Sequence, residues 1–219
     1  IFDTTKTEVD GILNGLDGQV DKAFTDGEGR AKSAFTADLK ARMDRYKDER
    51  YSGPSGWAQW VADQFKPLPP EVQAICDKSK KLYESEMAKV ISDVADIIGK
   101  ELGRAKDRVA QGRQEIAAYV NGLDPALKSV GQQAAKDIGS QFDALTESID
   151  EKSQSLADDL AEKYVAARQV VDDEITKMQE ENKGLWDKAK DAVGGAIGPI
   201  VKPKGMLMGV LARAAGAVE

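Results

Sequence analysis

The sequence predicts an all-α fold in which long helices pack side by side as an elongated antiparallel hairpin or three-helix bundle, similar to a coiled coil. Two observations predict this class. Charged residues make up 32% of the chain and aromatic residues only 6%, which suits helices meeting along narrow apolar seams. Hydrophobic residues also recur every eleven residues. Eleven residues cover three turns at about 3.67 residues per turn, so the predicted hendecad stripe is nearly straight or slightly right-handed.

The repeat is clearest in three series that start at Val94, Ile98 and Glu101 and advance by eleven residues. Of the 24 positions in these series, 20 are hydrophobic, against 41% of the whole chain. The N-terminal part of the chain shows the same step in a shifted register, from Val9 and Leu13. Isolated helices are held mainly by packing an apolar face, so these helices are expected to pack against one another.

Prolines divide the chain, because a helix interior rarely tolerates one. We expect the elements to form one structural unit. They are a first long helix over 1–53 with a possible break near 14–18, a connector over 54–70 containing a short amphipathic helix, a second long helix over 71–122, a third over 124–195, and an apolar, glycine-rich C-terminal segment over 196–219.

The run from Asn121 to Pro125 predicts a turn between the second and third helices. Asn121 and Gly122 can supply the left-handed residue that ends a helix. Asp124 can cap the next helix, and Pro125 suits its first position. A kink in one continuous helix is the alternative.

The connector carries large apolar residues at helical spacing: Trp57, Trp60, Val61 and Phe65. They predict one short amphipathic helix that covers the end of the bundle. Trp57, Trp60 and Phe65 are its candidate contact residues.

The composition argues against several kinds of chemistry. The chain has no histidine, so Ser-His-Asp and Cys-His arrangements and histidine metal sites are excluded. The single cysteine, Cys76, is interpreted as a small helix residue, because no imidazole can activate it. The net charge of −7 argues against nucleic-acid binding, which needs a concentrated positive face. We therefore expect no enzyme activity, no cofactor and no metal.

The C-terminal segment breaks the charge pattern, because ionisable side chains nearly vanish from residue 192 onward. One interpretation is a helix that caps the bundle or packs on a neighbouring domain. The other is a membrane-inserting or interfacial segment, although its apolar run is too short to span a bilayer. The candidate contact residues are Ile197, Ile200, Val201, Met206, Leu207, Met208, Val210 and Leu211.

Parts of the sequence resemble long helical regions of very large bacterial proteins associated with extracellular contractile injection systems. The residues that carry the resemblance are Phe2 and Asp3, the stretch from Val9 to Asp17, the run from Arg50 to Gly53, Glu181 to Gly184, and the tail from Gly209 to Gly216. Those proteins often carry a domain assigned as a metallopeptidase elsewhere, and no peptidase motif is present here. The resemblance implies a scaffold or delivery region within an exported cargo or toxin.

We expect a non-enzymatic helical scaffold or spacer region of a larger, exported or injected bacterial assembly or cargo protein. Its first residue is Ile1 rather than Met, which favours a segment of a longer chain. Its expected partners are other proteins or neighbouring domains. The alternatives are a membrane-active protein that inserts its C-terminal segment into lipid, and a stress-type or lipid-surface helical repeat protein.

Overall fold

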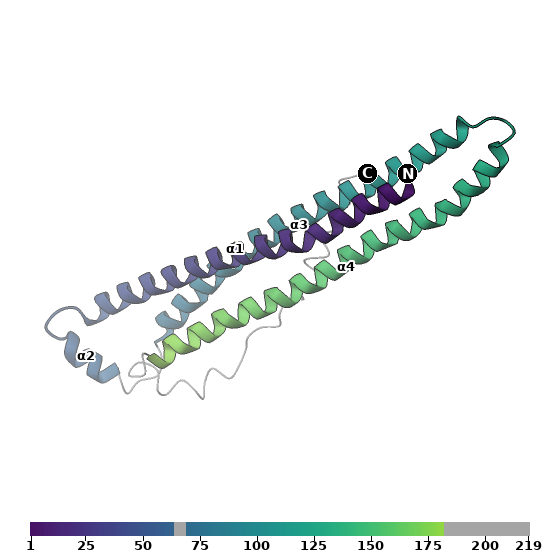
Figure 1. Cartoon of the computed structure of the whole chain (residues 1–219). Coiled ribbons are helices and arrows are strands. Elements are labelled where there is room, and N and C mark those ends of the chain that lie inside the picture. The colour runs from purple at the N-terminus through teal and green to yellow at the C-terminus, as the bar shows by residue number, and fades with distance from the viewer. Residues whose placement is uncertain (64–68, 182–219) are drawn as a thin grey trace. The chain divides into compact units, whose positions relative to one another are not determined.

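A computed structural model describes residues 1–63 and 69–181 (Figure 1). The described residues form four helices and no strand, and the long helices pack against one another. The predicted all-α class is therefore confirmed. The helices are α1 (Phe2–Tyr51), α2 (Gly56–Asp63), α3 (Pro70–Asn121) and α4 (Lys128–Glu181).

The helix bounds differ in detail from those expected. Helix α1 is continuous through residues 14–18, so the possible break there is absent. Helix α4 begins at Lys128 rather than at residue 124. Residues 182–195 of the expected third helix, and the whole segment 196–219, lie outside the part of the chain that the structure describes.

The link between α3 and α4 is a turn, as expected, but its chemistry differs from the prediction. Gly122 is not among the glycines with positive φ. Its N–H instead donates to the carbonyls of Ala118 and Tyr119, both at 3.1 Å, which closes the last turn of α3. Asp124 Oδ1 accepts the N–H of Ala126 at 2.9 Å, and the Asp124 carbonyl accepts the N–H of Leu127 at 2.9 Å. A separate turn therefore precedes α4.

Two glycines shape the link from α1 to α2. Gly53 has φ of +86°, a left-handed conformation that glycine adopts without a Cβ penalty. Gly56 opens α2 where a Cβ would lie only 1.9 Å from the Tyr51 carbonyl oxygen. A larger residue at either position would displace the start of α2.

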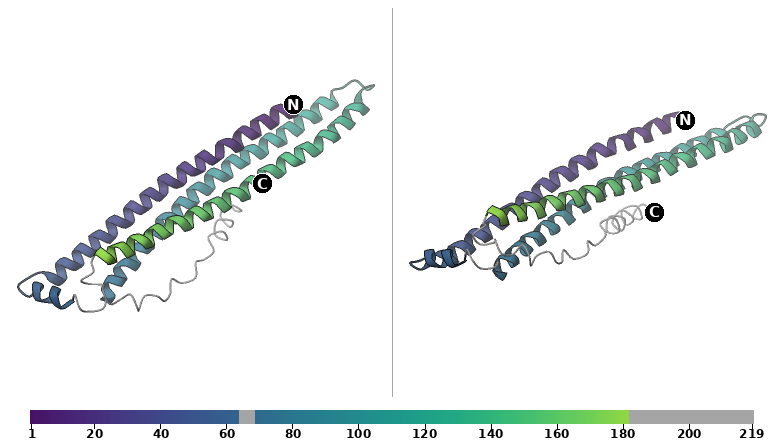
Figure 2. Two further views of the ribbon diagram at one scale, coloured as in Figure 1. Left: turned by 60° about the horizontal axis from the view of Figure 1, so that its bottom comes forward. Right: turned by 90° about the horizontal axis from the view of Figure 1, so that it is seen from below.

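The contacts divide the chain into two compact units, where the sequence had predicted one structural unit. Unit 1 contains Ile1–Phe24 and Ser92–Ala161, and unit 2 contains Thr25–Ile91 and, within the described residues, 162–181. Each unit therefore holds part of α1, α3 and α4. In each, α1 and α3 run antiparallel, and α3 and α4 run antiparallel (Figure 2).

The core of each unit lies along the facing stripes of its helices. In α1, burial recurs at intervals of four, four and three residues. Over residues 5–35 the buried positions are Thr5, Val9, Leu13, Leu16, Val20, Phe24, Gly27, Ala31 and Phe35, and the next two, Leu39 and Met43, each follow at an interval of four. In α3 the same intervals connect Ser79, Tyr83, Met87, Val90, Val94, Ile98, Glu101, Ala105, Val109 and Gly112. Apolar side chains on these stripes are removed from water, which is the main stabilising contribution to such helices.

Candidate functional site

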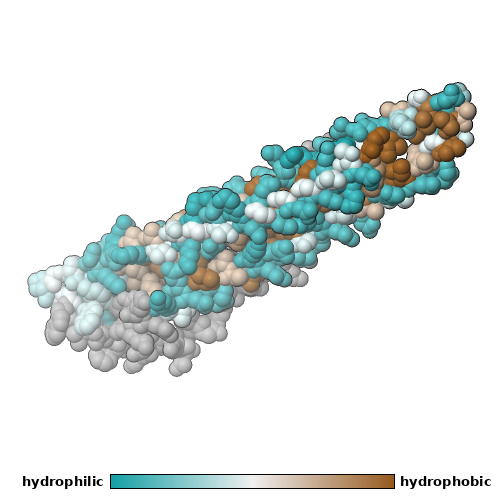
Figure 3. Space-filling model, viewed as in Figure 1, coloured by the Kyte–Doolittle hydropathy of each residue, from teal (hydrophilic) through white to brown (hydrophobic). Residues whose placement is uncertain are grey.

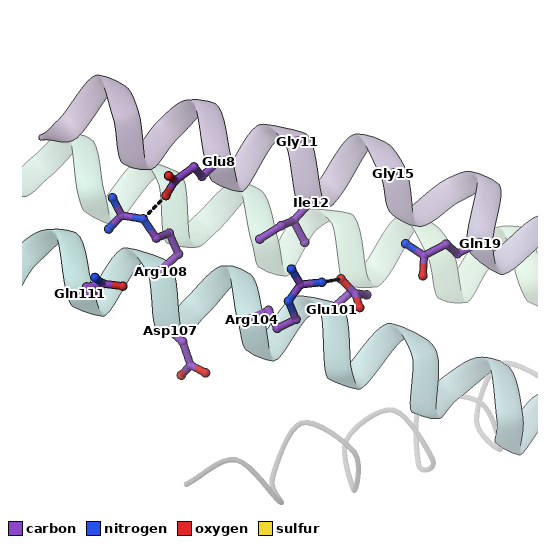
Figure 4. Close-up of a pocket in the computed structure, with 10 residues that line it drawn as sticks. All are labelled: Glu8, Gly11, Ile12, Gly15, Gln19, Glu101, Arg104, Asp107, Arg108 and Gln111. Atoms are coloured by element: carbon purple, nitrogen blue, oxygen red, sulfur yellow. Dashed lines mark hydrogen bonds and ion pairs between the residues drawn. The ribbon is translucent and has the colours of Figure 1, made fainter.

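A groove between α1 and α3 in unit 1 encloses about 600 Å³ (Figure 4). Five of its residues come from α1 and five from α3. They are Glu8, Gly11, Ile12, Gly15 and Gln19, and Glu101, Arg104, Asp107, Arg108 and Gln111.

The groove exists because α1 presents two glycines, Gly11 and Gly15, one turn apart on the same face. No atom of a neighbouring residue lies within 4 Å of the place where a Cβ would stand on either glycine. The groove floor is therefore open, with the half-buried Ile12 between the glycines. A larger side chain would fit at both positions, so close packing against another helix does not require glycine there.

Ion pairs occupy the walls of the groove. Arg108 Nε bonds to the Glu8 carboxylate across the two helices, and Arg108 Nη1 lies 3.5 Å from Glu115. Arg104 Nη1 lies 2.5 Å from Glu101 Oε2. In Figure 4 the Glu8 and Glu101 carboxylates meet these guanidinium groups, and Asp107 points away from α1. Four of the five charged residues that line the groove are thus paired within the protein, and Asp107 is the fifth.

A second groove, in unit 2, lies between α1 and α4 and also encloses about 600 Å³. Leu39, Met43 and Met178 give it apolar parts. Thr36 Oγ1 donates to Glu174 Oε1 at 2.9 Å, and Lys32 Nζ lies 3.9 Å from Glu174 Oε2. These polar contacts join the two helices in the same way as those of the groove in unit 1.

A third polar cluster fixes the connector to α1. Asp63, at the end of α2, is only 2% exposed and lies 2.6 Å from Arg50 Nε. Tyr51 donates its hydroxyl to the same carboxylate at 3.4 Å, and the Arg50 guanidinium lies 5.8 Å from the centre of the Tyr46 ring. The hydrogen bond to Asp63 raises the pKa of Arg50, and burial raises the pKa of Tyr46 and of Tyr51.

This cluster explains the place of α2, and sequence reasoning missed it. Arg50 and Asp63 are thirteen residues apart on opposite sides of a turn, so no helical spacing connects them. A buried pair of this kind is costly to break, because the remaining charge loses its partner. The cluster thus fixes α2 to the end of α1 through the Asp63 carboxylate.

Two of the predicted contact residues lie within the helices that the structure describes. Trp60 lies on α2 and is 45% exposed, and Trp57 lies on the same helix. Phe65 and all eight candidate residues between 197 and 211 lie outside the described residues. Their predicted contacts stay predictions.

Cys76 is buried in α3. Burial raises the pKa of its thiol to about 11, with a smaller contribution from Asp77. The thiol is therefore protonated at neutral pH and a poor nucleophile. This agrees with the interpretation of Cys76 as a small helix residue.

In residues 1–63 and 69–181, no group of three or more His, Cys, Asp or Glu side chains could hold a metal ion. None of the helices in these ranges carries an apolar stretch of the length that a bilayer span requires. Comparison with protein-family models, curated proteins and solved structures found no match.

Proposed function

We propose that the chain is a non-enzymatic helical scaffold or spacer region of a larger assembly or cargo protein. The observation that carries the proposal is that ion pairs and hydrogen bonds join helices at both grooves and at the connector: Arg108 to Glu8, Thr36 to Glu174, and Arg50 to Asp63. Such an arrangement holds helices in place and offers little chemistry to a substrate. The helices bury their apolar stripes against one another, and the ion pairs lie beside these stripes.

We propose further that the helices pack in an eleven-residue register. Three close contacts between α1 and α3 support it. Within unit 1, a Cβ on Gly112 would lie 2.5 Å from Thr5 Oγ1. Within unit 2, a Cβ on Gly27 would lie 2.6 Å from both Val90 methyl groups.

The third contact is a hydrogen bond in unit 2, in which Ser79 Oγ donates to Asp38 Oδ2 at 2.8 Å. Asp38 lies eleven residues after Gly27, and Ser79 lies eleven residues before Val90. Gly112 lies two such steps after Val90, and Thr5 lies two steps before Gly27. A step of eleven residues on both partners is what an eleven-residue packing register requires.

Circular dichroism of the full chain in dilute buffer at neutral pH tests the scaffold proposal. A scaffold should show a strong helical spectrum and a cooperative thermal transition, because its stripes are buried without any surface or ligand. A spectrum of an unfolded chain would remove the basis of the proposal. Residues Phe35 and Phe142, which are at most 2% exposed, favour the folded outcome.

The same measurement addresses the stress-type alternative. A chain that folds only on a surface would be unfolded in buffer and would gain helix when phosphatidylcholine vesicles are added. A helical spectrum that does not change on adding vesicles would count against this alternative.

The export part of the proposal rests on the resemblance to helical regions of proteins associated with contractile injection systems. Affinity purification of the full-length gene product from its native cells tests it. Recovery with structural components of such a system would support an exported cargo or assembly role. Recovery with unrelated cytosolic partners would contradict it, while leaving the helical scaffold proposal standing.

One sequence observation favours a second candidate, a membrane-active protein: the loss of charge after residue 192. Vesicle flotation of the chain with and without residues 192–219 decides between the two. Binding that depends on this segment would support membrane activity. Equal lack of binding by both forms would exclude the candidate.

A further inference from the structure

The end of unit 1 where α3 and α4 meet has an exposed apolar surface. We call residues 116–135 the hairpin tip. Tyr119 is 65% exposed, Leu127 56% and Val130 67%. Figure 3 shows hydrophobic residues gathered at this end of unit 1, whereas large apolar residues elsewhere in the unit are mostly buried. An exposed apolar cluster of this kind commonly marks an interaction surface.

The tip is exposed because α1 does not cover it. The first residues of α1 lie beside Phe142: the Phe2 and Phe142 rings meet edge to face with centroids 5.0 Å apart. Thr5 faces Gly112. The described part of α1 thus pairs with α3 and α4 only up to these residues, and Figures 1 and 2 show its N-terminus short of the turn between α3 and α4.

The exposed side chains of the tip are not needed to fill the space between α3 and α4. Leu123 already fills that space, because its Cδ1 would lie only 2.4 Å from a Cβ on Gly131. Leu127 continues the eleven-residue series that is buried at Val94, Ala105 and Ile149. The tip therefore keeps the apolar pattern of a helix contact while lacking the third helix.

The charge of the tip indicates what covers it. Asp124 and Lys128 are the only acidic and basic side chains of residues 116–135, so the formal net charge of the tip is zero. The whole chain carries −7, and most of its surface would repel another copy or an anionic membrane. Two tips can approach without like-charge repulsion, and Asn121, Gln132 and Gln133 can supply uncharged hydrogen bonds at the rim.

We propose that the hairpin tip is the interface of a homodimer. Two copies would pack their tips against each other. The tip of each copy would then cover the α3 and α4 residues of the other copy, as α1 covers these helices elsewhere in unit 1. The contact would use the same patch on both copies, as in a two-fold symmetric dimer. This inference does not depend on the scaffold proposal, since it rests on exposure and charge at the tip.

Sedimentation equilibrium of the full chain from micromolar to millimolar concentration tests the dimer. Val130→Glu and Val130→Lys each place two like charges at the interface, so each should raise the dimer dissociation constant by about tenfold or more. An equal mixture of the two variants should restore dimerisation, because unlike charges then meet. Val165→Glu is the matched control: Val165 lies on the same helix, in unit 2, and is 45% exposed.

A monomeric wild-type chain at all concentrations would overturn the proposal. So would a dimer that both Val130 variants leave intact, or one that Val165→Glu weakens equally. Flotation with neutral phosphatidylcholine vesicles adds a separate check: binding lost in both Val130 variants, together with a monomeric wild-type chain, would assign the tip to lipid instead. Circular dichroism confirms that each variant keeps its helices.

Discussion

Units 1 and 2 are built from the same three long helices, yet they fill their centres differently. In unit 1, α1 and α3 meet at Thr5 and Gly112, beside the edge of the Phe142 ring. In unit 2, the Phe35 and Tyr83 rings meet at 6.2 Å and 71°. The difference teaches that the same three helices can fill their centre either with small residues beside a ring or with two rings in contact.

The polar links between helices differ as well. In unit 2, the Lys80–Asp172 pair is 2.5 Å long and both side chains are 21% exposed. In unit 1, Lys106 and Asp150 lie 3.0 Å apart but are 47% and 63% exposed. Water screens the second pair more strongly, so its contribution to stability is smaller.

Removing a large core side chain from one unit should produce the largest difference in stability between the two units. Phe142→Ala should lower the free energy of unfolding by about 3–5 kcal/mol, because it leaves a cavity in unit 1. Urea denaturation measures the loss, and hydrogen exchange should show lower protection mainly in residues 92–161. Equal loss of protection in both units would show that they unfold together. Val165→Ala, at an exposed position, should change stability by less than about 0.5 kcal/mol.

A glycine pair tests the close contact of unit 1. Gly112→Ala should destabilise the protein by about 1–3 kcal/mol, because the new Cβ would lie 2.5 Å from Thr5 Oγ1 and 2.9 Å from the Phe142 ring. Gly139→Ala has no neighbour within 4 Å and should stabilise α4 by about 0.5–1 kcal/mol. Opposite shifts in melting temperature are expected. A stabilising Gly112→Ala would show that α1 and α3 are not in close contact there.

The polar contact of unit 2 should reveal itself through pH. Hydrogen bonds from Arg42 and then Ser79 hold the pKa of Asp38 below its ordinary value. The folded pKa is lower than the unfolded one, so the stabilisation is present above the unfolded pKa and is lost as pH falls through the folded pKa. Asp38→Asn should therefore cost about 1 kcal/mol at pH 7.

This loss of stability should be smaller in acid, where the wild-type Asp38 side chain is protonated and uncharged, as the Asn side chain is at every pH. Urea denaturation at a series of pH values measures both forms. A difference between wild type and Asp38→Asn that is constant from neutral to acid pH would contradict a role for the carboxylate charge. Ser79→Ala, which removes one donor, should give a smaller change of the same sign.

The smallest effect is expected at the exposed ion pair of unit 1. Asp150→Ala should change the free energy of unfolding by less than about 0.5 kcal/mol, because its pair with Lys106 is well solvated. Lys80→Ala, in the less exposed pair of unit 2, should cost more when measured in the same low-salt buffer. Equal effects would show that exposure does not distinguish the two sets of ion pairs.

Much of the fold followed from local signals. Prolines and the apolar stripe predicted the long helices, because both act over a few turns of one helix. The turn after α3 was predicted, but the conformation of Gly122 was not, because a bifurcated hydrogen bond to Ala118 and Tyr119 replaces a left-handed residue there. Helix α4 begins at Lys128, later than predicted, because Asp124 caps a separate turn that precedes the helix.

The sites were harder to predict because their partners are distant in sequence. Gly11 and Gly112 are both helix glycines, yet one borders an open groove and the other touches Thr5 and Phe142. Only the neighbouring helix distinguishes them. The Arg50–Asp63 pair likewise depends on the path of the connector. Leu127 fits the apolar stripe, and its exposure follows from where α1 lies.

The hydrogen bond between Ser79 and Asp38 also bears on how the helices find their alignment. An apolar stripe that repeats every eleven residues would look nearly the same to α3 if α1 slid by one full repeat. After such a slide, Asp38 would stand at the level of Val90, and its carboxylate would lose the Ser79 hydroxyl. A part-buried polar contact can thus select one alignment among several that the apolar residues alone would accept.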